Sequence, residues 1–165
     1  MKQSGFTLIE LFVTLVVIGV VASVAVPAMA EFVAAQRRFD VAQQLAHGVR
    51  TARNEAVVRN QLVMIRAIEG NWGNGWQIVV DPKGPEDDLV LMDKALSGDV
   101  PVVGNGRITQ SITFDGLGAA VGNGFVAGTL SICDVEQPLS HHQVILARTG
   151  RVRIESQTKS EKLCG

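Results

Sequence analysis

The sequence is short of charge. Asp, Glu, Lys and Arg make up 19% of its 165 residues, whereas hydrophobic residues make up 47%. This balance excludes disorder of the low-hydropathy, high-charge kind over most of the chain. The shortage is greatest in residues 6–30, where Glu10 is the one ionisable group. We therefore expect a membrane-attached protein, and the length allows one domain of ordinary size with at most one appendage.

The sequence also lacks the patterns that carry most enzyme chemistry. No serine stands in a nucleophile elbow, and no cysteine and histidine have a recognisable catalytic spacing. Gly116, Gly118 and Gly122 miss the dinucleotide-binding spacing, because the third glycine comes one residue late and no helical pattern follows. Asp81 with the acidic residues 86–88 could hold calcium, but the ordered loop spacing is missing and such loops are usually solvated. We expect neither an enzyme nor a cofactor.

A charge-free run of twenty residues follows Glu10. At the rise of an α-helix, residues 11–30 would extend about 30 Å, the thickness of the hydrocarbon core of a bilayer. The small residues Ala28 and Ala30 before Glu31 leave open a cleaved secretory signal peptide instead. However, the run is longer than the usual h-region of about 7 to 15 residues. A carboxylate such as Glu10 in an apolar helix costs up to about 3 kcal/mol, so it indicates a functional group with a partner.

The N-terminal motif GFTLIE, residues 5–10, resembles the processing motif of type IV prepilins and type II secretion pseudopilins. The resemblance implies that prepilin peptidase cleaves after Gly5, that the new terminal residue Phe6 is N-methylated, and that Glu10 pairs with an N-terminal amine during filament assembly. Such a pair between subunits would relieve the desolvation of both charges and fix their axial register. Pro27 matches the helix proline of this family, although a proline that the bilayer merely tolerates would look the same.

The same resemblance implies a single-pass protein of the bacterial inner membrane with a periplasmic C-terminal domain. Its partners would be prepilin peptidase and other major and minor pilins or pseudopilins. The positive-inside rule favours the opposite orientation, because Lys2 is the only basic residue before the span while Arg37 and Arg38 follow it. The prepilin motif is more specific than this charge rule and takes precedence. The expected division is a leader (1–5), a transmembrane and filament-core helix (6–30) and a periplasmic pilin domain (31–165).

Beyond the span, the pattern predicts that the helix continues over residues 31–59 and stops at Asn60. Its apolar stripe, at steps of three and four residues, comprises Ala35, Phe39, Ala42, Leu45, Val49, Ala52 and Ala56. Short β-like runs separated by turn residues follow at 62–67, 76–80, 89–92, 108–114, 128–133, 144–147 and 151–154. The expected fold class is α+β, with the long helix packed on an antiparallel β-sheet as in pilins. The β-rich region would be 62–154 and the polar tail 155–165.

Several later segments narrow the resemblance to the GspH/FimT group of minor pilins and minor pseudopilins. These segments are residues 51–61, 75–81, 112–118, 128–133 and 148–153. The resemblance implies a low-copy, non-enzymatic subunit near the tip of a periplasmic filament, which initiates assembly or contacts cargo. It does not separate a type IV pilus from a type II secretion machine.

Cys133 and Cys164 are the only cysteines, and behind a prepilin-type span both would lie in the oxidising periplasm. We expect a disulfide, which would close a loop of about 32 residues and contribute roughly 3 to 4 kcal/mol. Two unpaired thiols are the plain alternative. A metal site with His141 and His142 is disfavoured, because adjacent histidines point apart on a strand and the usual paired cysteine spacing is absent.

Charge is unevenly spread, with a net −7 in residues 67–136 and +3 in residues 137–165. Gly150 and the three residues after it resemble a glycine-arginine-x-arginine motif of minor pilins that bind DNA for natural uptake. On a strand, Arg151 and Arg153 would share one face. The resemblance predicts double-stranded DNA as a partner, bound through its phosphates without sequence specificity; the alternative is a solvated strand face. The candidate residues are Arg148, Gly150, Arg151, Arg153, Lys159 and Lys162.

Overall fold

The computed structural model describes residues 7–81, 89–122 and 126–164. The chain divides into two compact units, residues 1–36 and 37–165. One helix, α1 (Leu8–Arg59), contributes to both units and ends where the sequence predicts. Asn60 after it has a φ of 51°, the left-handed conformation that commonly ends a helix. The expected cleavage site at Gly5 and Phe6 and the acidic residues 86–88 lie outside the described residues.

The first unit consists of the N-terminal part of α1, which continues through Pro27. Its large apolar side chains are exposed, for example Leu8 at 84% and Val24 at 70%. An 18-residue window of α1 has a mean hydropathy of 2.6, so this helix is long and apolar enough to cross a membrane. Apolar side chains without a protein neighbour require lipid or other subunits around them, because water is a poor solvent for them.

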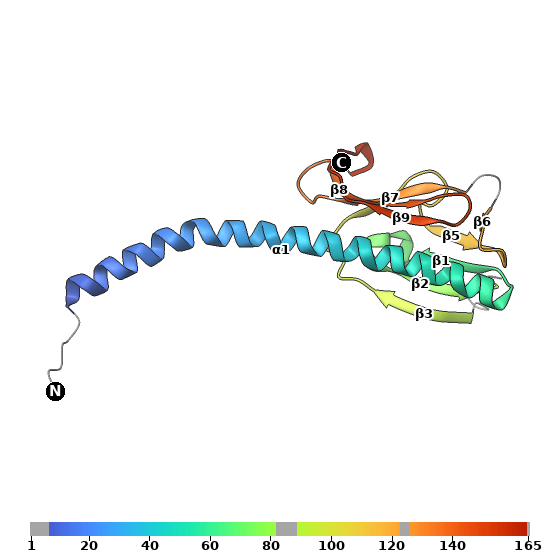
Figure 1. Ribbon diagram of the computed structural model, residues 1–165, viewed down its shortest axis with the longest axis horizontal. Helices are drawn as coiled ribbons and strands as arrows, with labels where there is room; N and C mark the ends of the chain where they lie inside the picture. The colour runs from blue at the N-terminus through green and yellow to red at the C-terminus, as the bar shows by residue number, and fades with distance from the viewer. Residues whose placement is uncertain (1–6, 82–88, 123–125, 165) are drawn as a thin grey trace, which may run out of the picture. The chain divides into compact units, whose positions relative to one another are not determined.

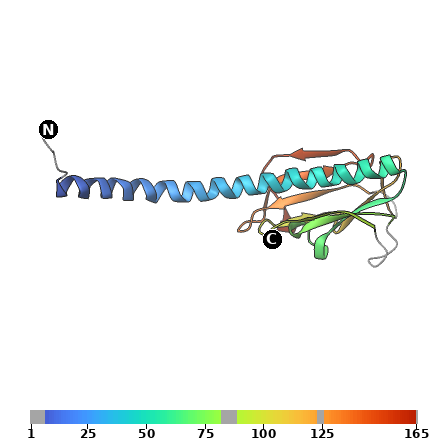
Figure 2. The same cartoon turned by 90° about the horizontal axis from the view of Figure 1, so that it is seen from below.

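In the second unit, the C-terminal part of α1 lies against the β-strands (Figures 1 and 2). The predicted stripe is confirmed from Ala42 to Ala56, where its members are fully or almost fully buried. The prediction was wrong for Ala35 and Phe39, which are exposed. Arg38 is buried instead, because its guanidinium reaches an aspartate of the β-rich region.

The β-strands form two antiparallel sheets, where the sequence analysis expected one. The first sheet has the order β3-β2-β1-β5-β6; the second has β10-β8-β7-β4, with β9 also paired to β8. The strands of the first sheet are β1 (Val63–Ala67), β2 (Gly75–Val80), β3 (Leu89–Ala95), β5 (Ser111–Phe114) and β6 (Ala120–Val121). Those of the second are β4 (Val102–Gly104), β7 (Gly128–Cys133), β8 (Leu139–Leu146), β9 (Val152–Glu155) and β10 (Lys159–Ser160).

Both sheets bury their inner residues against the same part of α1. The shared core includes Leu45 of α1, Ile65 and Phe114 of the first sheet, and Leu130 and Val144 of the second. Alternation of buried and half-buried residues along β1 is the period-two pattern of a strand with one face on a core. The helix therefore joins the two sheets into one α+β unit.

Some strands differ from the sequence prediction. β4, β6 and β10 are only two or three residues long and were not predicted. β5 begins at Ser111, not at Ile108, whose carbonyl oxygen accepts a hydrogen bond from Trp72 Nε1 at 3.1 Å. The expected polar tail is partly ordered, since it contains β10 and the 3-10 helix η3 (Lys162–Cys164).

Candidate functional site

The start of α1 is closed by a reciprocal pair of hydrogen bonds between Thr7 and Glu10. The backbone N–H of Glu10 donates to Thr7 Oγ1 at 3.3 Å, and the backbone N–H of Thr7 donates to Glu10 Oε2 at 3.2 Å. The Thr7 hydroxyl also donates to Glu10 Oε2 at 3.1 Å. This is a capping box, which satisfies two backbone donors that a helix N-terminus leaves free.

The capping box explains how an apolar helix carries a carboxylate at this position. Glu10 stabilises the N-terminus of its own helix, where negative charge is favoured. Its side chain is still exposed, and only one of its two carboxylate oxygens is used by these bonds. The other oxygen can accept a bond from a cation supplied by another molecule.

The expected disulfide joins Cys133 and Cys164, 31 residues apart in the sequence. Cys133 is fully buried at the end of β7, and Cys164 belongs to η3. The bond thus holds the C-terminal segment to the second sheet, and it leaves neither sulfur as a thiolate for a metal. In the described part of the chain, no three His, Cys, Asp or Glu side chains gather as a metal site.

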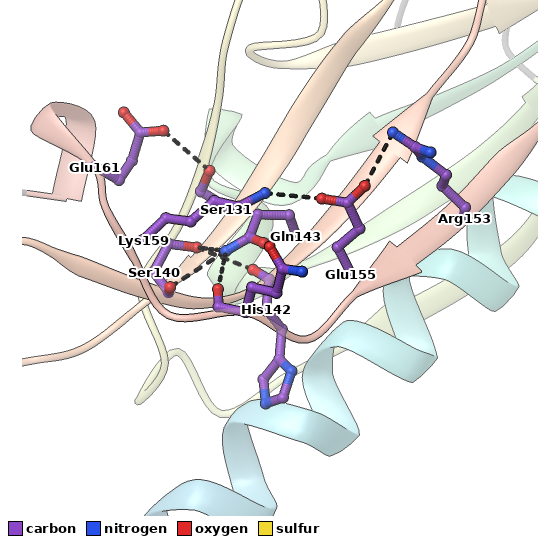
Figure 3. Close-up of polar contacts among 9 residues, drawn as sticks. Ser131, Ser140, His142, Gln143, Arg153, Glu155, Lys159 and Glu161 are labelled. Atoms are coloured by element: carbon purple, nitrogen blue, oxygen red, sulfur yellow. Dashed lines mark hydrogen bonds and ion pairs between the residues drawn. The ribbon is translucent and has the colours of Figure 1, made fainter.

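Side-chain hydrogen bonds hold the rest of the C-terminal segment to β8 (Figure 3). Gln143 Nε2, which is buried, donates to Ser140 Oγ at 2.8 Å and to the carbonyl oxygen of Gln157 at 3.0 Å.

Lys159 Nζ and Arg153 Nη2 both bind the carboxylate of Glu155, at 2.8 and 2.9 Å. The Lys159 hydrogen bond, helped by the charges of Lys159 and Arg153, lowers the pKa of Glu155, and desolvation opposes this change.

A second polar cluster connects α1 to the segment between β7 and β8. Arg38 Nη1 lies 3.1 Å from Asp134 Oδ2, and His141 Nε2 lies 3.4 Å from the same oxygen. The backbone N–H of Glu136 donates to Asp134 Oδ1 at 2.9 Å. Backbone hydrogen bonds, of which that from Glu136 is the strongest, lower the pKa of Asp134, and Arg38 adds to this effect. Burial lowers the pKa of the neighbouring His142, because it disfavours the charged imidazolium.

The structure places part of the predicted basic group together. Arg151 and Arg153 are exposed and line a recess of about 180 Å³ with Ile145 and Ala147. We call this the arginine recess. Gly150 occupies the turn before it with a φ of 75°. Arg151, just before β9, and Arg153, within β9, thus lie on the same side of the chain, as the sequence predicted.

Other members of the predicted group contribute less free charge. Lys159 and Arg153 share the carboxylate of Glu155, which offsets part of their positive charge. Lys162 lies in η3 beside the disulfide. Arg148 precedes the Gly150 turn, and its carbonyl oxygen accepts a bond from Ala120 N–H at 3.3 Å. The members that the structure brings together are therefore Arg151 and Arg153, which both line the recess, and Arg153 also pairs with Glu155.

Comparison with known families decides which class of protein carries these features. The family model of the type II transport protein GspH matches residues 41–150, and that of the prokaryotic N-terminal methylation motif matches residues 1–26. This chain belongs to the GspH family. It is thus a member of the minor pilin and pseudopilin class, whose proteins are structural subunits.

The fold of this GspH-family protein is also similar to two crystal structures of the type IV minor pilin FimU from Pseudomonas aeruginosa. One has 21% sequence identity and a TM-score of 0.60, and the match covers 74% of this chain and 97% of the crystallised FimU chain. The other has 21% identity and a TM-score of 0.62, and the match covers 79% of this chain and 98% of the crystallised chain. No curated protein sequence matches the chain.

Sequence reasoning missed two residues of α1 that support the arginine recess of this GspH-family protein. Arg53 Nε donates to the carbonyl oxygen of Gly118 at 2.9 Å, and Arg50 Nη2 donates to that of Val152 at 3.3 Å. Both arginines lie on the polar side of the predicted helix. Nothing in the local sequence indicates their partners, which follow 65 and 102 residues later.

Proposed function

We propose that the protein is a minor pilin of the bacterial inner membrane, cleaved by prepilin peptidase and incorporated at or near the tip of a type IV pilus. The observation that carries this proposal is the exposed apolar N-terminal part of α1, with Glu10 beside its start. A lipid bilayer covers such a helix before assembly, and neighbouring helices cover it in a filament. The carboxylate of Glu10 then meets the N-terminal amine of another pilin.

Mass spectrometry and filament isolation test this proposal. The intact mass should equal that of residues 6–165 plus one methyl group, and Glu10→Ala should remove the protein from sheared pili while membrane levels stay unchanged. Glu31→Ala removes another carboxylate from α1 and should leave incorporation unchanged. A mature chain that begins at Glu31 would show a cleaved signal peptide and end the proposal.

A minor pseudopilin of a type II secretion system is the alternative with the same fold and processing. The two machines differ in the neighbouring subunits, not in the motifs of this chain. Crosslinking in cells, followed by identification of the crosslinked subunit, separates them. Crosslinks to pseudopilins alone would support a structural role in secretion.

A second function is supported by the arginine recess: binding of double-stranded DNA during uptake. Arg151 and Arg153 stand side by side on an exposed face, where two guanidiniums can bind the phosphates of one strand. Arg148 adds a third cation in the preceding turn. Since no Phe, Trp or Tyr follows residue 125 in the sequence, we expect contacts to duplex phosphates and not stacking on bases.

The salt dependence of DNA binding measures how many phosphates the basic residues neutralise. The full chain in zwitterionic micelles should bind random duplexes with a slope of log K against log salt of about −3. Arg151→Gln should reduce that slope by about one unit. Arg59→Gln is the matched control, because Arg59 pairs with Glu55 on α1 and does not line the recess. If the wild type binds no DNA at low salt, only the structural role remains.

A further inference from the structure

Leu117 is an apolar side chain that the fold presents to solvent at a fixed place. It lies in the turn between β5 and β6 and is 87% exposed. Asp115 closes this turn, because its Oδ1 accepts bonds from Leu117 N–H at 3.0 Å and from Ala119 N–H at 2.9 Å. Gly118 N–H also donates to the carbonyl oxygen of Asp115 at 2.9 Å. A side chain held on such a turn loses little backbone entropy when it enters a binding site.

The Leu117 turn is packed directly against the turn that carries the basic motif. A Cβ atom built on Gly150 would lie 2.0 Å from the carbonyl oxygen of Gly118, so the two backbones touch. The hydrogen bond from Arg53 to Gly118 fastens this contact to α1. Leu117 and Arg151 are each next in sequence to one of the two touching glycines. The turn that carries Leu117 and the turn that carries the basic motif are therefore in direct contact.

The last turn of α1 also adjoins the Leu117 turn. Val57 is 46% exposed, and its Cγ2 is 3.0 Å from the Cβ position of Gly118. An apolar side chain with cations near it is complementary to a partner that has apolar walls and an anionic rim. In the minor groove of duplex DNA the sugars form such walls and phosphates border them, and apolar side chains can insert between the base steps at its floor.

We propose that Leu117 enters the minor groove of a DNA duplex whose phosphates are bound by Arg151 and Arg153. This inference rests on the DNA-binding function proposed above. Charge favours a polyanion over a neutral protein surface, because Arg148, Arg151 and Arg153 lie within six residues and Glu155 offsets only part of their positive charge. Apolar side chains inserted beside phosphate-binding arginines are a general means of holding a duplex by its minor groove.

Binding of a short fluorescent duplex to the full chain in zwitterionic micelles, at several salt concentrations, tests the proposal. Leu117→Ser should weaken binding about 3- to 10-fold at every salt concentration with the slope unchanged, because no phosphate contact is lost. Leu117→Met should restore most of the affinity, because it restores the apolar volume. Val135→Ser, at a 72% exposed position next to Asp134, is the matched control and should bind as the wild type.

Competition with a small minor-groove ligand gives a second measurement. When the ligand saturates the minor groove, the affinity of the wild type for the duplex should fall to that of Leu117→Ser. The affinity of Leu117→Ser should hardly change. If the wild type binds DNA but Leu117→Ser binds equally well, the role of Leu117 is overturned while DNA binding stands. Loss of Leu117→Ser from sheared pili with normal DNA affinity would show a subunit contact and equally overturn it. Absence of any DNA binding by the wild type instead removes the DNA function itself.

Discussion

Arg53 of helix α1 donates a hydrogen bond from Nε to the carbonyl oxygen of Gly118, 65 residues later in the chain, at 2.9 Å. The bond is partly buried and lies beneath both the Leu117 turn and the Gly150 turn. The Cβ position of Gly150 is only 2.7 Å from Arg53 Nε, which shows how closely the guanidinium underlies the motif. One side chain thus supports both turns of the candidate DNA-binding surface.

Removing this bond should destabilise the second unit. Arg53→Met keeps most of the alkyl chain but leaves the Gly118 carbonyl without its charged donor, and we expect a loss of about 1.5 to 3 kcal/mol in the free energy of unfolding. Arg59→Met removes an exposed ion pair with Glu55 and should cost only about 0.5 kcal/mol. Urea denaturation of the two variants gives the comparison. Equal midpoints would show that the Arg53 bond contributes nothing.

Gly150→Ala should be more damaging than an ordinary glycine substitution. The φ of 75° costs an alanine about 1 to 3 kcal/mol, and its Cβ would also collide with the Gly118 carbonyl. Gly106→Ala provides the control, since its φ is 62° but the nearest atom to its Cβ is 3.4 Å away. We expect Gly150→Ala to lose stability and DNA affinity, and Gly106→Ala to lose some stability alone. The same loss in both would mean that only the positive φ matters.

Reducing the disulfide should destabilise the protein strongly. Opening a loop of 31 residues removes about 4 kcal/mol of stabilisation on the chain-entropy model, and it frees η3 from the end of β7. Chemical denaturation with and without dithiothreitol measures this loss. The double variant Cys133→Ser, Cys164→Ser should resemble the reduced protein and not respond to reductant. A reduced wild type as stable as the oxidised one would contradict the prediction.

Stability should fall on moderate acidification because of His142. Its pKa is lowered in the folded state, so below about pH 6.5 the unfolded chain binds a proton that the folded chain resists. The free energy of unfolding should therefore decrease from about pH 7 to about pH 5, and less so in His142→Gln. The pKa of Asp134 is also lowered in the folded state, so protonation of this residue reduces the free energy of unfolding only as the pH falls below about 4.

The long helix could be predicted from the sequence because each of its features is encoded by neighbouring residues. An apolar run sets a helix long enough to span a bilayer, and Asn60 marks its end with a positive φ. The amphipathic stripe from Ala42 to Ala56 follows from the helical period alone. Pairing of Cys133 with Cys164 was predictable too, because no other cysteine competes.

The tertiary structure alone decided which polar residues meet. The burial of Arg38, the sharing of Glu155 by Arg153 and Lys159, and the division into two sheets depend on strand pairings that local patterns do not specify. From the sequence, Arg53 is a residue on the polar side of the helix and Leu117 is a turn residue, and neither pattern indicates a contact between distant segments. Only the folded chain brings Gly118 against Gly150 and places Arg53 beneath both turns, because contact between distant segments is set by packing of the whole core and not by spacing in the sequence.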